Sequence, residues 1–113
     1  MLTEEGYLLR LFIDENDRIG GKPLYEWIVL EAHARGLAGA TVLRGVMGFG
    51  ANTRVIHTFK IERLSEGLPI VIELVDTLEK LEAFLAHIDD KIPSGLATLE
   101  RVQIRFYRSS AHH

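Results

Sequence analysis

The stretch that decides the fold is PIVIELVDTLEKLEAFLAHIDDKI, residues 69–92. Its first eight residues alternate, with Ile70, Ile72 and Leu74 on one side, which is the period of a β-strand. Residues 76–79 have the composition of a capping box, in which Asp76 caps a helix and Glu79 stands at the third helical position. Apolar residues then recur on one helical stripe, at Leu78, Leu81, Leu85, Ile88 and Ile92. The stretch therefore predicts a strand followed by an amphipathic helix.

A second strand and helix precede this pair. Residues 7–14 alternate between apolar and mixed positions and predict a strand. Pro23 suits the first turn of a helix that runs to Arg35, and Gly36 is a natural stop. This helix is apolar on more than one face, which indicates deep packing or contact with a partner subunit.

Two further strands complete the pattern, at residues 40–47 and 99–107. Gly45 inside the first indicates a bulge or a close backbone approach, and Ile104 and Phe106 of the second are expected to point inward with Val102. The segment 51–68 is ambiguous, with strand-like alternation at residues 55–64. The order β-α-β-β-α-β predicts an α+β, ferredoxin-like split β-α-β fold, with an antiparallel sheet and two helices on one face.

Composition narrows the class of protein. The length of 113 residues suits one domain, 1–113, with a core at 7–107 and a tail at 108–113. A net charge of -3 gives no electrostatic case for nucleic acid, and the absence of cysteine excludes disulfides. No signal-peptide pattern and no apolar run of the ~20 residues that a membrane span needs are visible, so we expect a cytoplasmic protein without membrane insertion. Whether the terminal histidines are native is open.

The strongest candidate for chemistry is a glycine cluster around Phe49, formed by Gly45, Gly48 and Gly50. Backbone N–H groups of such a turn can hold an anion, although the spacing alone favours a simple strand-ending turn. His57 could bind metal or phosphate, but no metal-ligand spacing accompanies it. The acids at 14–17 and 89–90 fit solvated turns better than a catalytic pair. No activated nucleophile is recognisable, so we expect no enzyme and no catalytic residue.

Basic residues form two groups that could converge on an anion. One lies in the second strand and the segment after it, and the other lies on the last strand. Alternation with apolar residues fits the outer face of a sheet equally well, and a subunit boundary would have to join the groups to make a site. Their members are Arg44, Arg54, Lys60 and Arg63, and Arg101, Arg105 and Arg108.

Several motifs together resemble a known family. Residues 36–42, GLAGATV, lead to Gly48-Phe49-Gly50, and Leu68-Pro69 leads into an alternating strand, as in the PII signal-transduction proteins. The whole chain from Tyr7 to Tyr107 is more similar still to the PII-like domain of unknown function 190. The motifs that carry this likeness are GKPLYE at 21–26, LRGVMGFG at 43–50 and IHTFKI at 56–61.

The resemblance implies a homotrimer with small-molecule sites in the clefts between subunits. PII proteins bind adenine nucleotides there and use the long loop to grip a target protein. Two lysines of the PII site are missing here, since Ile70 follows Leu68-Pro69 and residues 93–96 read PSGL. These departures, and Ala51-Asn52 after the glycine motif, argue against ATP binding in the PII manner, unless Arg44, Lys60 or Arg105 substitutes.

We therefore expect a trimeric PII-like regulatory protein that binds a small anionic effector between subunits, has no known cofactor, and regulates a partner protein through a change of order in residues 51–68. One alternative is a ligand-free adaptor, for example a partner of a membrane transporter. Another is a divalent-metal protein of the copper-tolerance type with its metal at His57. The residues expected to bind the effector are Gly39, Thr41, Arg44, Gly48, Phe49, Gly50, His57, Lys60 and Arg105.

Overall fold

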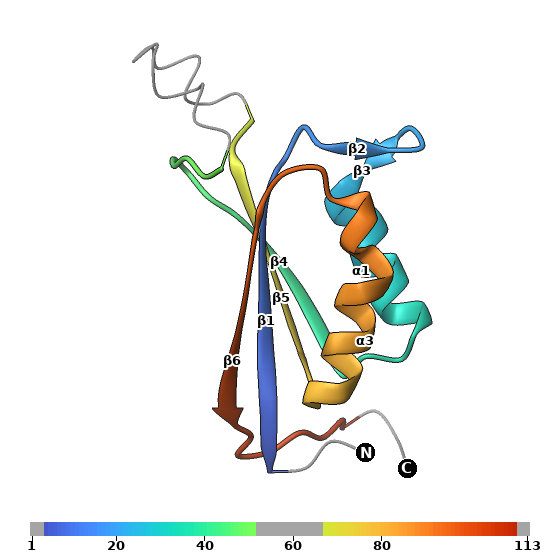
Figure 1. Cartoon of the computed structure of the whole chain (residues 1–113). Helices are drawn as coiled ribbons and strands as arrows, with labels where there is room; N and C mark the ends of the chain where they lie inside the picture. The colour runs from blue at the N-terminus through green and yellow to red at the C-terminus, as the bar shows by residue number, and fades with distance from the viewer. Residues whose placement is uncertain (1–3, 52–66, 111–113) are drawn as a thin grey trace.

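The computed structural model describes residues 4–51 and 67–110. Six strands, two α-helices and one 3₁₀ turn follow one another in these ranges (Figure 1). Their bounds are β1 Glu5–Asp14, β2 Arg18–Ile19, β3 Lys22–Pro23, α1 Leu24–Ala34, β4 Gly39–Arg44, β5 Pro69–Asp76, α3 Leu78–Ile88, η2 Asp89–Lys91 and β6 Leu96–Gln103.

The main sheet has the strand order β4-β5-β1-β6, and every neighbouring pair is antiparallel. β1 is a central strand, in which Leu9 lies opposite Leu74 of β5 and Leu99 of β6. The short strands β2 and β3 form a separate hairpin that the sequence did not reveal. Figure 1 shows α1 and α3 on the same side of the main sheet. The predicted α+β, ferredoxin-like architecture is confirmed.

The core lies between the sheet and the two helices. Alternation along β1 and β5 sends every second side chain toward the helices, where it is buried. Burying one such aliphatic side chain contributes about 1.5–3 kcal/mol, so this layer supplies most of the driving force for folding. The buried apolar residues of the cluster are Leu9, Leu11, Ile13, Leu24, Ile28, Ala32, Ile70, Ile72, Leu74, Leu81, Phe84 and Ile88.

The helix stripes differ slightly from prediction. In α3 the buried residues are Leu81, Phe84 and Ile88, with Leu85 only partly buried. In α1 one stripe is buried, whereas Leu30 remains 49% exposed. The apolar character of α1 therefore extends onto the surface, as its composition indicated.

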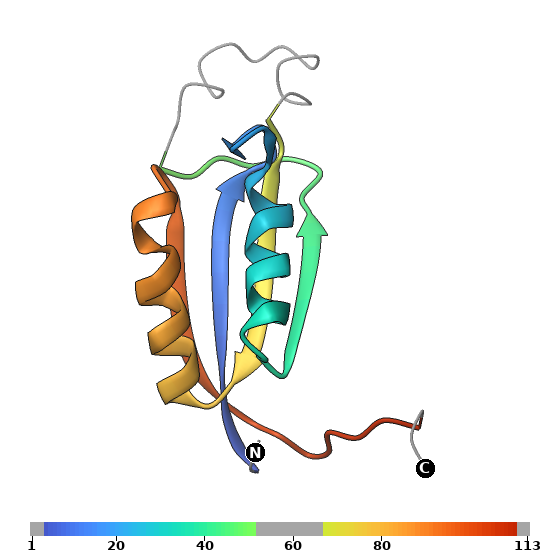
Figure 2. The same ribbon diagram turned by 90° about the vertical axis from the view of Figure 1, so that its right-hand side faces the viewer.

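The opposite side of the sheet carries no helix in the described part of the chain (Figures 1 and 2). We call it the open face. By register it includes Leu8, Arg10 and Phe12 of β1, Val71, Glu73 and Val75 of β5, Thr41 and Leu43 of β4, and Leu96, Thr98, Glu100 and Val102 of β6. The prediction that Val102 points inward is therefore wrong.

One arginine stands at the centre of the open face. The Arg10 guanidinium donates from Nε to Glu73 at 3.0 Å and from Nη1 to Glu100 at 3.2 Å. The bond to Glu73 is the main reason that the pKa of Arg10 is raised, so the side chain stays charged. Arg10 thus links β1 to both neighbouring strands on an otherwise largely apolar surface.

Two predicted strands end earlier than expected. β4 ends at Arg44, and Gly45 lies just after it, with its N–H donating to the Pro69 carbonyl at 2.7 Å. A Cβ at Gly45 would lie 2.8 Å from Cγ of Pro69, so the close approach is confirmed but no bulge interrupts β4. β6 spans Leu96–Gln103, because β1 begins at Glu5, which pairs with Gln103; just beyond this pair the Ile104 amide donates to the Glu4 carbonyl at 2.6 Å. The prediction of a strand to residue 107 is wrong, and Phe106 is 68% exposed instead of inward.

The predicted capping box is also wrong. Thr77 is the N-cap of α3, and its hydroxyl accepts a hydrogen bond from the Lys80 amide at 3.3 Å. Asp76 belongs to β5 and is only 3% exposed. Its carboxylate accepts from the Thr77 amide at 2.7 Å and from the Ala38 amide at 2.8 Å, so it joins β5 to the turn between α1 and β4.

We predict that Asp76→Ala lowers the free energy of unfolding by about 1–3 kcal/mol, because a part-buried backbone N–H loses its acceptor. Urea unfolding measured by circular dichroism tests this value. The matched control is Asp90→Ala, since Asp90 is an exposed residue of η2. Equal stability of the two variants would contradict the role assigned to Asp76.

Candidate effector site

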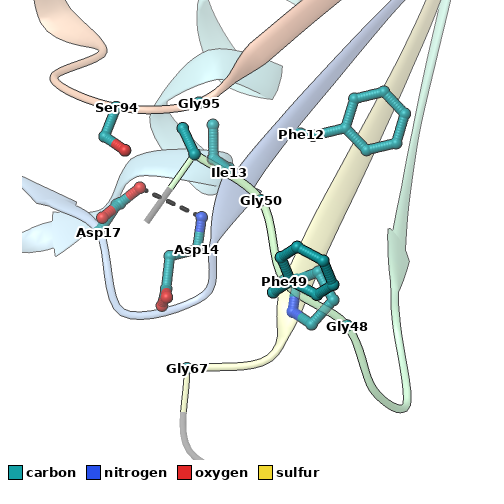
Figure 3. Close-up of a pocket in the computed structure, with 12 residues that line it drawn as sticks. Phe12, Ile13, Asp14, Asp17, Gly48, Phe49, Gly50, Gly67, Ser94 and Gly95 are labelled. Carbon is teal, nitrogen blue, oxygen red and sulfur yellow. Dashed lines mark hydrogen bonds between the residues drawn. The ribbon is translucent and has the colours of Figure 1, made fainter. Parts of the chain in front are cut away.

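A small hollow lies where β1 ends and β5 begins (Figure 3). Its volume is about 120 Å³, well below the roughly 300–1,000 Å³ of pockets that enclose an organic ligand. The hollow alone is therefore too small to enclose an organic ligand. Its lining consists of Phe12, Ile13, Asp14, Asp17, Gly48, Phe49, Gly50, Ala51, Gly67, Pro69, Ser94 and Gly95.

Glycines allow the chain to approach the end of β1 closely. Gly67 has φ 62°, and a Cβ there would lie 2.9 Å from an Asp14 carboxylate oxygen. A Cβ at Gly95 would lie 2.7 Å from the Phe12 carbonyl oxygen. Any larger residue at these positions would push the wall of the hollow outward, so glycine sets its shape.

The acidic turn after β1 forms one wall. The Asp14 amide donates to the Asp17 carboxylate at 3.1 Å, and the Asn16 amide donates to the Asp14 carboxylate at 2.7 Å. The turn predicted from the sequence is confirmed, but Asp14 and Asp17 also line the hollow, which the sequence did not indicate. Their signal in the sequence is indistinguishable from that of an ordinary turn.

Burial raises the pKa of Asp17, and the neighbouring Asp14 charge adds to this effect, while the hydrogen bond from the Asp14 backbone opposes it. The carboxyl of Asp17 thus holds its proton more readily in the folded chain than in the unfolded chain.

The cation that precedes the glycine motif in the sequence already has a partner. Arg44 donates from Nε and Nη2 to the carboxylate of Glu15, at 3.2–3.3 Å. The same carboxylate accepts the Leu68 amide at 3.1 Å, and the Glu15 amide donates to the Leu68 carbonyl at 3.0 Å. Glu15 therefore joins the end of β1 to the end of β4 and to the residue before β5.

The structure brings together only some of the residues expected to bind an effector. Gly48, Phe49 and Gly50 line the hollow. Gly39 lies at the other end of β4, where it pairs with Val75 near the end of β5, and Thr41 pairs with Glu73 in the middle of β5. His57 and Lys60 lie outside the described residues, as does most of the segment 51–68.

Arg105 also lies far from the hollow of its own chain. It follows β6, in the segment that Figure 2 shows crossing the base of the sheet. Two residues later the Tyr107 hydroxyl donates to the Ala38 carbonyl at 2.6 Å, beside the start of β4. Arg105 and Gly39 are thus at one end of the sheet, Thr41 lies opposite Glu73 near its middle, and the glycine motif is at the other end.

The described residues contain neither a cluster of metal ligands nor a membrane-spanning helix. No group of three or more histidine or acidic side chains there could hold a metal ion. No helix among them is long and apolar enough to span a membrane.

We predict that Asp17→Asn removes a pH-dependent component of stability. Because folding raises the pKa of Asp17, the folded chain binds more protons than the unfolded chain just above the ordinary aspartate pKa. Wild type therefore loses stability through this group as pH rises through that range, and the variant does not. Free energies of unfolding across acidic pH test this, with Asp90→Asn as the control; parallel curves for wild type and Asp17→Asn would contradict it.

Solved structures share the fold of this chain at low identity. A chain from Thermus thermophilus described as a PII-like signaling protein matches with a TM-score of 0.62 and 18% identity, covering 92% of this chain and 93% of that one. CPII from Thiomonas intermedia K12, bound to ADP and bicarbonate, matches with a TM-score of 0.62 and 16% identity, covering 88% of each chain. The same protein bound to ADP, AMP and bicarbonate gives a TM-score of 0.60 at 15% identity, covering 88% of this chain and 94% of that chain.

Sequence relatives are much closer. A UPF0166 protein of Aquifex aeolicus is 42% identical over 97 residues, which is 86% of this chain and 90% of the relative. A UPF0166 protein of Methanocaldococcus jannaschii is 34% identical over 88 residues, or 78% of this chain and 80% of the relative. The model of DUF190, described as an uncharacterized ACR, matches residues 6–104. With its PII-like fold and these relatives, the chain belongs to the DUF190 (UPF0166) family.

Proposed function

We propose that this protein is a regulatory sensor, not an enzyme, which assembles as a trimer and binds a small anionic effector between its subunits. The observation that carries the proposal is the hollow between the Gly48-Phe49-Gly50 motif and Ser94-Gly95. CPII, which shares the fold, is bound to ADP and bicarbonate in one solved structure and to ADP, AMP and bicarbonate in another. An adenine nucleotide is accordingly the first effector to test, and a cytoplasmic partner protein the expected target.

The composition of the hollow supports a site shared between copies. Its described lining contains two aspartates and no lysine or arginine, which does not suit a phosphate by itself. The missing positive charge is available on the segment after β6, where Arg105 and Arg108 lie beside the exposed rings of Phe106 and Tyr107. Since this segment cannot reach the hollow of its own chain, a second copy is the natural source.

The open face supports the same assembly. Leu43 and Leu96 of this face are 48% and 56% exposed, and no described helix covers the sheet around them. A domain of this size gains stability by burying such a surface against another copy. We propose that open faces meet around a threefold axis and place each segment after β6 beside the next subunit.

We predict that Leu43→Asp converts the trimer to a monomer, because a carboxylate would be buried unpaired in the interface. Light scattering coupled to size exclusion measures the mass. Leu30→Asp is a closely matched control, since Leu30 of α1 is 49% exposed and Leu43 is 48% exposed. A wild-type monomer, or equal masses for the two variants, would contradict the assembly.

We further predict that the trimer binds ADP more tightly than adenosine, and that Arg105→Gln removes most of the difference. A charge-assisted hydrogen bond contributes about 1.5–3 kcal/mol, so ADP affinity should fall about tenfold or more. Isothermal titration calorimetry with ADP, AMP, bicarbonate and adenosine measures this, with Arg18→Gln as the control because Arg18 is held by the Gly21 carbonyl. Failure of every anionic probe to bind would favour a ligand-free adaptor instead.

A further inference from the structure

The carboxylate of Glu15 joins the end of β4, where the chain leaves the main sheet, to the residue before β5, where the chain enters it again. Glu15 follows β1, Arg44 is the last residue of β4, and Leu68 precedes β5. Glu15 binds the Arg44 guanidinium and the Leu68 amide with the same carboxylate, and its Oε1 accepts from both. We call these residues the Glu15 junction.

The two partners of Glu15 differ in how firmly they are held. Leu68 is buried and is joined to Glu15 by two hydrogen bonds, one to its side chain and one to its backbone. The Arg44 side chain is 59% exposed, while that of Glu15 is 25% exposed. Arg44 can therefore leave Glu15 without unfolding the sheet, whereas Leu68 cannot.

The junction adjoins the hollow. Asp14, beside Glu15, and Pro69, beside Leu68, both line it. Gly45, beside Arg44, donates to the Pro69 carbonyl at 2.7 Å. Neither Arg44 nor Glu15 lines the hollow itself, so an anion that extends from the hollow toward Arg44 would meet a guanidinium that already has a carboxylate partner. An arginine fork suits the oxygens of phosphate and carboxylate equally well, so the anion and Glu15 compete for one group.

We propose that effector binding exchanges the partner of Arg44, from Glu15 to the oxygens of the anion. Glu15 then sets the affinity for the anion and couples anion binding to the Leu68 amide. This inference rests on the effector site of the proposed function. It adds a carboxylate that competes with the anion for Arg44. It also adds an effect on Leu68, because a Glu15 carboxylate released by Arg44 keeps the Leu68 amide as its partner among the described residues. The hydrogen bonding of Leu68 then depends on whether the anion is bound.

The exchange predicts opposite effects on ADP affinity for substitutions of Glu15 and of Arg44. Glu15→Gln removes the competing charge but keeps a side-chain oxygen for the Leu68 amide, so ADP should bind about two- to fivefold more tightly, as expected for an exposed ion pair. Arg44→Gln should weaken ADP binding. The double variant should behave like Arg44→Gln alone, because Glu15 acts only through Arg44. Adenosine affinity should stay constant in all of them.

Isothermal titration calorimetry with ADP and adenosine measures these affinities, with bicarbonate as a second anion that has no nucleobase. Glu82→Gln is the control for the change of net charge, since Glu82 lies exposed on α3. Tighter ADP binding by Glu15→Gln but not by Glu82→Gln supports the exchange. Unchanged or weaker binding by Glu15→Gln overturns it, as does a double variant that still differs from Arg44→Gln.

A second measurement does not depend on nucleotide binding. The amide signal of Leu68 is followed by NMR while inorganic pyrophosphate is added to wild type and to Arg44→Gln. The exchange predicts a shift in wild type that Arg44→Gln abolishes. If pyrophosphate moves Leu68 but no nucleotide binds, the nucleotide sensor is wrong and the exchange stands. If ADP binds and Leu68 stays unmoved, the exchange is wrong and the sensor stands.

Discussion

The pairing of β1 with both of its neighbours is the constraint on which the rest of the structure depends. Leu9, Leu11 and Ile13 reach the helices only in the register that places Leu9 opposite Leu74 and Leu99. A slip of one residue would bring Arg10 into the core and turn these side chains outward, at a cost of several buried aliphatic groups. The same register gathers the ends of β1 and β4 and the start of β5 into one corner, and this corner is where the hollow and the Glu15 junction lie.

Elements with strong periodicity were predictable, and elements decided by distant contacts were not. The bounds of β5 follow directly from the alternation of residues 69–76, and α3 follows from its apolar stripe. The end of β6 depends instead on where its partner strand β1 begins, and no pattern within residues 99–107 indicates that position. Asp76 has a side chain typical of a helix cap, yet its carboxylate accepts a hydrogen bond from the Ala38 amide. That amide is distant in the sequence and comes near Asp76 on folding.

The candidate site was predictable to a similar degree. The glycine motif at 48–50 was recognisable because glycines cluster where a chain must turn, and it does line the hollow. Glu15, Asp14 and Asp17 were indistinguishable from ordinary turn formers, since their role comes from Leu68, Arg44 and Gly67 across the sheet. Sequence spacing also could not separate the two ends of β4, so Gly39 and Gly48 were expected in one site although they lie at opposite ends of the sheet.

The ion group at the middle of the open face has a consequence for association. One guanidinium faces two carboxylates there, which leaves an excess of negative charge on each copy. When like surfaces meet around a symmetry axis, these excess charges repel one another, and dissolved ions screen that repulsion over a Debye length of about 8 Å at physiological ionic strength. Self-association through this surface should then strengthen as salt is added, the reverse of what an interface held by complementary ion pairs would do.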